Sequence, residues 1–136
     1  MARDFRTRLS KRAARTGLFL DEGLADSLAA YYELLARWNR KINLTALDNP
    51  DEVIDRLLLE PVIAARALPL GTGPVEVIDI GSGGGSPAIP LALALGPGTR
   101  LTMVEVKARK SAFLREAVRH LGLAGATVET ARHEEL

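Results

Sequence analysis

Hydrophobic positions in the first 70 residues recur every three or four residues, which is the spacing of helices with one buried face. Phe5, Leu9 and Ala13 lie four residues apart and predict an amphipathic helix over residues 1–16. A second series spans residues 24–42 and follows Asp21, a residue type that caps helix N-termini. These patterns predict two helices, each with one face packed inward.

A third helix is predicted to begin after Asn49. Asn49 is a candidate N-cap, Pro50 suits the first helical position, and an acidic residue follows at Glu52. The apolar pattern continues to about Ala67, and residues 43–47 read as a turn before the cap. We therefore expect residues 1–70 to form a helical N-terminal layer.

The pattern changes after the glycines and proline of residues 71–74. Short runs rich in β-branched residues now alternate with helical segments. The predicted strands are residues 75–80, 101–105 and 126–130, and the predicted helices are residues 86–95 and 107–121. Such alternation favours parallel strands with right-handed crossovers, so residues 71–136 are expected to form the first half of a doubly wound α/β sheet.

Composition narrows the class of protein. The 136 residues suit one domain, and the 47% apolar and 26% charged fractions are those of a globular protein. Without cysteine there is no disulfide, thiolate metal site or cysteine nucleophile. No apolar stretch is long enough to cross a bilayer, and no secretory signal follows the N-terminal charges. We expect a cytoplasmic protein that does not associate with a membrane and binds no metal ion.

Basic residues are concentrated at the N-terminus, although the net charge is only +1. Six of the 18 basic residues precede residue 17: Arg3, Arg6, Arg8, Lys11, Arg12 and Arg15. This basic arm has three interpretations, namely a solvated helix face, a contact with RNA phosphates and an organelle-targeting segment.

A glycine-rich segment joins the first predicted strand to the next helix. It reads Asp79-Ile80-Gly81-Ser82-Gly83-Gly84-Gly85. Glycine permits positive φ and close approach of a ligand to the backbone, and the free N–H groups of the helix start favour a polar ligand edge. Glu105 ends the next strand, 24 residues after Gly81, where an acid can accept hydrogen bonds from both ribose hydroxyls. Together these features predict a nucleoside cofactor.

The residue at position 86 favours one cofactor over another. A dinucleotide fingerprint needs glycine or alanine where Ser86 stands. The spacing therefore favours S-adenosylmethionine over a nicotinamide cofactor. The remaining interpretation is a glycine-rich connection that binds nothing.

The whole chain resembles the first two thirds of the bacterial small-subunit rRNA (guanine-N7) methyltransferases, the RsmG or GidB family. The resemblance rests on Leu34-Leu35-Ala36-Arg37-Trp38-Asn39, Asn43-Leu44-Thr45, Asp79-Ile80-Gly81-Ser82-Gly83, Pro87, Ile89-Pro90-Leu91, Glu105, Arg109-Lys110, Phe113-Leu114 and Arg132-x-Glu134-Glu135. It implies a class I SAM-dependent methyltransferase with a Rossmann-like sheet, acting on 16S rRNA of the small ribosomal subunit.

The resemblance also implies roles for individual residues. Cofactor contacts would come from Asp79, Gly81, Gly83, Gly85 and Ser86, with Glu105 on the ribose and His133 with Glu134 beside the adenine. RNA contacts would come from Lys107, Arg109, Lys110 and Arg132, and the basic arm adds Arg6, Arg8 and Arg12. For Lys107, Arg109 and Lys110 a solvated helical turn is the other interpretation, and Trp38 is expected in the core rather than against a base. No catalytic residue is assigned, because guanine N7 offers a lone pair without losing a proton.

The chain departs from the family pattern at several positions. Leu57, Glu60 and Pro61 stand where the family has His-x-x-Asp-Ser, and Ser86 and Ala88 replace a large apolar residue and a glycine. Leu136 follows the third strand directly, so the sheet is expected to be partial, with the edge of its first strand unpaired. The sequence is then expected to be a fragment, a shortened gene product or a chain that is completed by a partner chain. Weak or absent methylation by the isolated chain is expected.

Two other functional classes remain. An inactive SAM- or RNA-binding remnant would keep the glycine segment without catalysis. An α/β-hydrolase would use residues 84–88 as a nucleophile elbow around Ser86, with His133 later in the chain. The absent final glycine of the elbow and the helices that precede the first strand argue against the hydrolase.

Overall fold

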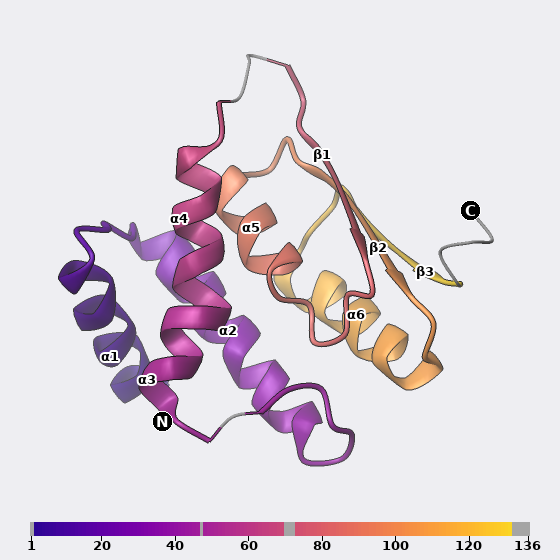
Figure 1. Cartoon of the computed structure of the whole chain (residues 1–136), viewed down its shortest axis with the longest axis horizontal. Coiled ribbons are helices and arrows are strands. Elements are labelled where there is room, and N and C mark those ends of the chain that lie inside the picture. Colours follow the sequence, from indigo (N-terminus) through magenta and orange to yellow (C-terminus); the bar gives the residue numbers. More distant parts are fainter. Residues whose placement is uncertain (1, 47, 70–72, 132–136) are drawn as a thin grey trace.

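The computed structural model describes residues 2–46, 48–69 and 73–131, in which helices come first and strands follow (Figure 1). The helical part contains α1 (Ala2–Arg15), α2 (Glu22–Asn39), α3 (Pro50–Val53), the π-helical segment η1 (Ile54–Leu59) and α4 (Glu60–Ala67). The second part contains β1 (Glu76–Ile80), α5 (Ala88–Leu95), β2 (Arg100–Glu105), α6 (Ala108–Leu121) and β3 (Ala126–Thr130). The element order predicted from the sequence is confirmed.

Both predicted helix caps are present. The Asp21 carboxylate accepts a hydrogen bond from the Leu24 N–H at 2.8 Å, and the Asn49 side chain accepts from the N–H groups of Asp51 and Glu52. Each cap provides an acceptor for N–H groups that have no partner inside the helix. The helix starts are therefore determined by local sequence.

The third predicted helix is continuous but not regular. Its central six residues, Ile54–Leu59, are π-helical. Pro61 has no N–H, so it cannot donate the α-helical hydrogen bond to the carbonyl of Leu57, four residues earlier. The helix after β1 also differs from expectation, because it begins at Ala88 and not at residue 86.

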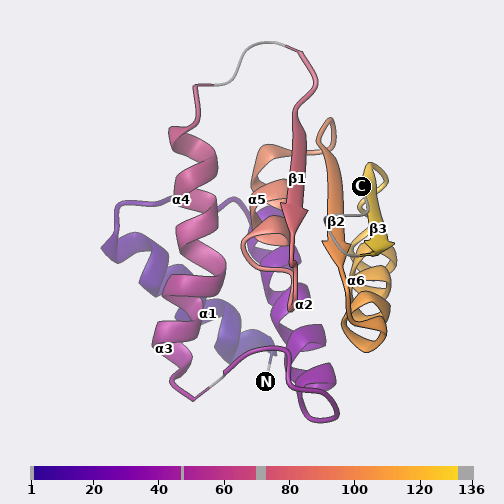
Figure 2. The same cartoon turned by 45° about the vertical axis from the view of Figure 1, so that its right-hand side comes forward.

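The strands form a parallel sheet in the order β1-β2-β3, as predicted (Figure 2). Val77 pairs with Leu101, and Asp79 pairs with Met103, which in turn pairs with Val128. This register brings the carboxyl ends of β1 and β2 together, where Gly81 and Glu105 lie.

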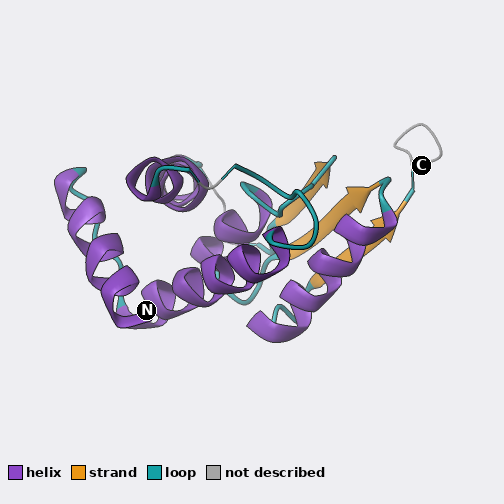
Figure 3. Ribbon diagram, turned by 90° about the horizontal axis from the view of Figure 1, so that it is seen from below, coloured by secondary structure: helices purple, strands orange, loops and turns teal. Residues whose placement is uncertain are grey.

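Helices α5 and α6 cover one face of the sheet, and α2 packs behind them (Figure 3). One cluster of buried side chains joins both parts of the chain, from Leu28 and Leu35 of α2 through Leu58 of η1 to Met103 and Phe113. The helical layer and the sheet thus share a core. Within the described ranges, no helix has the length and apolar character needed to cross a membrane.

The opposite face of the sheet is largely open. Ile78 and Ile80 on β1 point away from the shared core and are 66% and 55% exposed. In Figure 3 the described helices lie on the other side of the sheet. β1 is also an edge of the sheet.

Candidate functional site

The loop between β1 and α5 leaves part of its backbone open. Gly81 and Gly83 have φ values of 78° and 53°, in the left-handed region that favours glycine. A Cβ at Gly81 would meet nothing within 4 Å, and one at Gly83 would meet only the Gly81 carbonyl oxygen at 3.9 Å. These two glycines provide a surface on which a ligand can approach the main chain.

The second half of the same loop packs inward. A Cβ at Gly84 would lie 3.3 Å from Leu35 Cδ1, and one at Gly85 would lie only 2.7 Å from Ile89 Cδ1. The Tyr31 hydroxyl donates a hydrogen bond to the Gly84 carbonyl at 2.5 Å. Of the predicted cofactor contacts, Gly85 is therefore buried against the core, whereas Gly81 and Gly83 are open.

Glu105 holds this loop from the end of β2. Its side chain is buried, with one carboxylate oxygen accepting from the Gly83 N–H and the other from the Lys107 N–H, each at 2.9 Å. A carboxylate oxygen has two lone pairs, so each oxygen can accept a further hydrogen bond. Glu105 thus combines support of the loop with the capacity to bind a diol.

The end of β1 carries a second carboxylate, one oxygen of which is buried. Asp79 Oδ2 is buried and has no hydrogen-bond partner among the described residues. The adjoining backbone is fixed, because the N–H groups of Gly81 and Ser82 both donate to the Val104 carbonyl, at 2.8 and 3.2 Å. A buried acceptor without a partner is costly, and it fits a site for a ligand that carries hydrogen-bond donors.

The Trp-Asn and Asn-Leu-Thr segments are brought together. The Asn39 side-chain oxygen accepts from the N–H groups of Leu44 and Thr45 at 2.7 and 3.0 Å. Trp38 packs edge-to-face on Phe113, with ring centroids 5.7 Å apart. Trp38 is therefore partly buried against the core, and Asn39 shapes the loop after α2.

A basic hollow of about 520 Å³ lies where α6 begins. Lys107, Arg109 and Lys110 line it together with Lys41 and Asn43 from the loop after α2. The sequence predicted the first three as RNA contacts, but not the contribution of Lys41, since that depends on how α2 packs against α6. The first turn of α6 contains no acidic residue, and the side chain of its N-cap residue Lys107 makes no capping hydrogen bond.

Three arginines of the basic arm form ion pairs within the protein. Arg6 pairs with Asp26 at 2.6 Å, and Arg8 lies 3.6 Å from Asp51. Arg12 makes two hydrogen bonds to Asp55, at 2.5 and 3.1 Å, and these lower the pKa of Asp55.

These pairs attach α1 to α2, α3 and η1. The assignment of the three arginines to RNA remains a prediction. Arg132, His133 and Glu134 lie outside the described residues.

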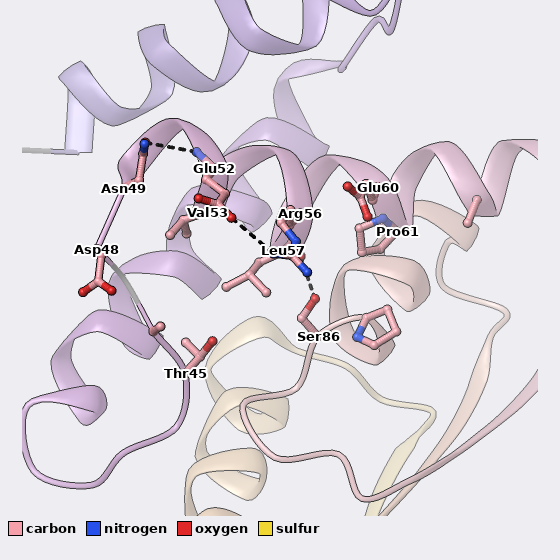
Figure 4. Close-up of a pocket in the computed structure, with 13 residues that line it drawn as sticks. Thr45, Asp48, Asn49, Glu52, Val53, Arg56, Leu57, Glu60, Pro61 and Ser86 are labelled. Carbon is pink, nitrogen blue, oxygen red and sulfur yellow. Dashed lines mark hydrogen bonds and ion pairs between the residues drawn. The ribbon is translucent and has the colours of Figure 1, made fainter.

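A larger cavity, of about 680 Å³, opens at the end of the glycine loop (Figure 4). Ser86 and Pro87 form one side, and the helix from Asn49 to Ala64 forms another. The Ser86 hydroxyl donates to the Leu57 carbonyl at 2.8 Å. Across the described ranges, histidine, aspartate and glutamate side chains form no group of three that could ligate a metal ion.

Sequence reasoning missed Tyr31 and this cavity. Tyr31 falls within the apolar series of residues 24–42, and nothing in the local sequence indicates that its hydroxyl reaches Gly84, 53 positions away. Most of the cavity residues are likewise more than 20 positions from Ser86 in the sequence. The only available signal was that Leu57, Glu60, Pro61 and Ser86 depart from the family pattern.

A parallel sheet whose first strand leads into an open glycine loop, with an acid at the end of the second strand, defines a Rossmann-like nucleotide-binding fold. Comparison with known proteins narrows the class of protein to one family. The family described as rRNA small subunit methyltransferase G matches residues 24–136. The chain belongs to this family.

Individual relatives carry the same name. The chain is 44% identical to ribosomal RNA small subunit methyltransferase G of Stenotrophomonas maltophilia (strain K279a) over 117 residues, 86% of this chain and 53% of the relative. It is 43% identical to the Xylella fastidiosa (strain M23) protein, covering 88% and 54%, and 40% identical to the Cupriavidus necator protein, covering 96% and 59%. The chain thus spans somewhat more than half the length of these relatives.

A solved structure, coclaurine N-methyltransferase bound to N-methylheliamine and SAH, aligns with 96% of this chain and 45% of its own. The TM-score is 0.46 and the sequence identity is 15%.

Proposed function

We propose that this chain forms the cofactor-binding part of an S-adenosylmethionine-dependent methyltransferase that modifies N7 of a guanine in 16S rRNA of the small ribosomal subunit. The observation that carries the proposal is the open backbone at Gly81 and Gly83 beside the Glu105 carboxylate. Relatives named rRNA small subunit methyltransferase G support the substrate class.

The residues present fit this cofactor. The two oxygens of Glu105 can each accept one more hydrogen bond, which suits the two hydroxyls of a ribose. The unpartnered oxygen of Asp79 suits a donor group of the ligand. Ser86 borders the site through the end of the loop, and Gly85 supports it from the core side. His133 and Glu134 are proposed to border the adenine.

The chain needs to position the reacting groups rather than to provide a general acid or base. S-adenosylmethionine, when bound, provides a methyl group activated by its sulfonium. Guanine N7 has a lone pair and no proton to lose, so the residues around it need not act as a general base. The buried anchors Tyr31 and Glu105 hold the loop in one geometry, which is how a protein favours such a transfer.

RNA phosphates are proposed to meet the basic hollow of Lys41, Lys107, Arg109 and Lys110, with further contacts from Arg132 and the α1 arginines. Phosphate contacts position an RNA without reading its sequence. The reaction is proposed to take place in the cytoplasm, and the edge of β1 is proposed as the place where a partner strand would extend the sheet.

Calorimetry with S-adenosylhomocysteine, the demethylated product, tests the proposal on the 136-residue chain. We expect saturable binding, and at least tenfold weaker binding in Glu105→Gln, because an amide cannot accept hydrogen bonds at both positions. Glu129→Gln, an exposed acid on β3, is the control. The absence of binding by a folded chain would contradict the proposal.

A methylation assay on small-subunit particles separates the enzyme from an inactive remnant, since only the remnant binds the cofactor product without any transfer. The hydrolase interpretation is disfavoured, because the Ser86 hydroxyl donates to a main-chain carbonyl rather than to a base. Covalent labelling of Ser86 by a fluorophosphonate would revive that interpretation.

A further inference from the structure

The cavity in Figure 4 has the size of a small-molecule site and adjoins the cofactor loop. Its volume of about 680 Å³ is within the usual range for ligand pockets. Ser86 and Pro87, which line it, directly follow the loop whose glycines we assign to the cofactor. A group held in this cavity would therefore lie next to the end of that loop.

The wall of the cavity is attached to the cofactor loop by one hydrogen bond. Pro61 cannot donate to the Leu57 carbonyl, and the helix around Leu57 is π-helical. The Ser86 hydroxyl donates to this carbonyl at 2.8 Å. Short π-helical turns are frequent at functional sites. Here the turn forms the cavity wall and fixes its position relative to the loop.

The lining combines apolar surfaces with a few polar groups. The apolar part comes from Val53, Leu57, Pro61, Ala64 and Pro87. Glu52 is paired with Arg56 at 3.2 Å, whereas Glu60 is exposed and its carboxylate, free of hydrogen bonds and ion pairs with the described residues, is open to a ligand. Thr45 and Asp48 lie across the cavity from the helix (Figure 4).

The charges of the lining residues indicate which kind of ligand the cavity can bind. Asp48, Glu52 and Glu60 outnumber the single cation Arg56, so a phosphate group would be repelled. Ionised carboxylates only accept hydrogen bonds, so the cavity suits a group that is rich in donors and carries no negative charge. Guanine presents N1–H and a 2-amino group side by side, whereas adenine and cytosine place a donor beside an acceptor.

We propose that this cavity receives the guanine base and that Glu60 accepts hydrogen bonds from N1–H and the 2-amino group. The inference rests on the proposed function and names the residue that would give it base specificity. N7 lies on the imidazole ring, away from the edge that Glu60 contacts, and so stays free for methylation. Glu60 is chosen over Asp48 because its helix is the wall bonded to Ser86.

A nuclear magnetic resonance titration of the 136-residue chain tests this assignment with guanosine, inosine and adenosine as probes. Inosine lacks the 2-amino group and keeps N1–H. We expect guanosine to shift resonances of cavity residues and to bind about tenfold more tightly than inosine or adenosine, as for a lost bidentate contact. Glu60→Gln is expected to remove the preference, and Glu60→Asp, which keeps a carboxylate, to retain it.

Three results would overturn the assignment. Equal binding of guanosine and inosine, or shifts confined to residues outside the cavity, would exclude base recognition here. Loss of preference in Asp48→Asn but not in Glu60→Gln would move the role to Asp48. S-adenosylhomocysteine binding is measured on the same samples. If it fails, the proposed function fails, while the guanosine preference is judged separately.

Discussion

The hydroxyl of Tyr31 on α2 donates to the carbonyl of Gly84 in the cofactor loop. Tyr31 is fully buried, and burial raises the pKa of its hydroxyl, so the group remains a donor across the physiological pH range. The helical layer therefore contributes directly to the shape of the loop at the end of β1.

Tyr31→Phe should lower both stability and cofactor affinity. The substitution removes one buried donor and leaves the Gly84 carbonyl without it, which costs about 1–2 kcal/mol in free energy of unfolding. Urea denaturation and calorimetry with S-adenosylhomocysteine measure the two effects. Tyr32→Phe is the matched control on the same helix, because Tyr32 stacks on Phe5 and its hydroxyl bonds no described residue. Equal losses in both variants would contradict the role of Tyr31.

Ser86 and Pro61 should be energetically coupled. Ser86→Ala removes the donor to the Leu57 carbonyl and should cost about 1 kcal/mol. Pro61→Ala restores an N–H four residues after Leu57, so the second substitution should reduce the cost of the first. A double-mutant cycle by urea denaturation measures the coupling, with Ser10→Ala on α1 as the control. Strictly additive effects would show that the two positions do not compensate.

Substitutions at Gly81 and Gly85 should have different effects on stability and on cofactor affinity. Gly81→Ala places a methyl group in open space at positive φ, with a stability cost of about 1 kcal/mol and a marked loss of cofactor affinity. Gly85→Ala brings its Cβ within 2.7 Å of Ile89 at φ 89°, so it should be the more destabilising change. Thermal unfolding and calorimetry on both variants give the comparison. The reverse order of stability would contradict this division.

The Arg12–Asp55 pair predicts a pH dependence. Hydrogen bonding to Arg12 lowers the folded pKa of Asp55, so the pair stabilises the fold above the unfolded pKa of about 4, and this contribution is lost as pH falls through the lower folded pKa. Asp55→Asn should therefore be less stable than the parent chain at pH 7. The gap in thermal stability between Asp55→Asn and the parent chain should become smaller as the pH is lowered from 7 to 2.5. Thermal unfolding measures this gap, and the control Glu129→Gln should differ little from the parent chain at any of these pH values. A constant gap would contradict the prediction.

Neutralising the basic hollow should weaken RNA binding in a salt-dependent way. Replacing Lys107, Arg109 and Lys110 by glutamine removes three of the four cations of the hollow. The slope of log affinity against log salt should fall by about 2, from the loss of three phosphate contacts. Filter binding to small-subunit particles measures it, with Arg119→Gln near the C-terminus of α6 as the control. An unchanged slope would remove the hollow from the RNA surface.

Sequence patterns predicted what is local and missed what is distant. Asp21 and Asn49 were correctly assigned as caps because an N-cap acts within three residues. The π-helical turn was missed, because Pro61 indicates that one helical hydrogen bond is absent near Leu57 but not that Ser86, 29 residues later, supplies the donor instead.

Contacts between residues distant in the sequence were also missed in the candidate functional site. One glycine-rich run predicted a ligand loop, but only the packing of Ile89 against Gly85 distinguishes its inner side from the open side at Gly81. Likewise, the arginines of α1 could not be matched to Asp26, Asp51 and Asp55 before the helices were placed.

The two isoleucines that β1 turns away from the shared core affect how the chain behaves at high concentration. Exposed apolar side chains on an edge strand favour association between molecules, so solubility depends on Ile78 and Ile80. Thermal stability depends instead on the buried interior. Precipitation and unfolding are thus separate liabilities of this molecule, and a polar residue at either position would relieve the first while leaving the second almost untouched.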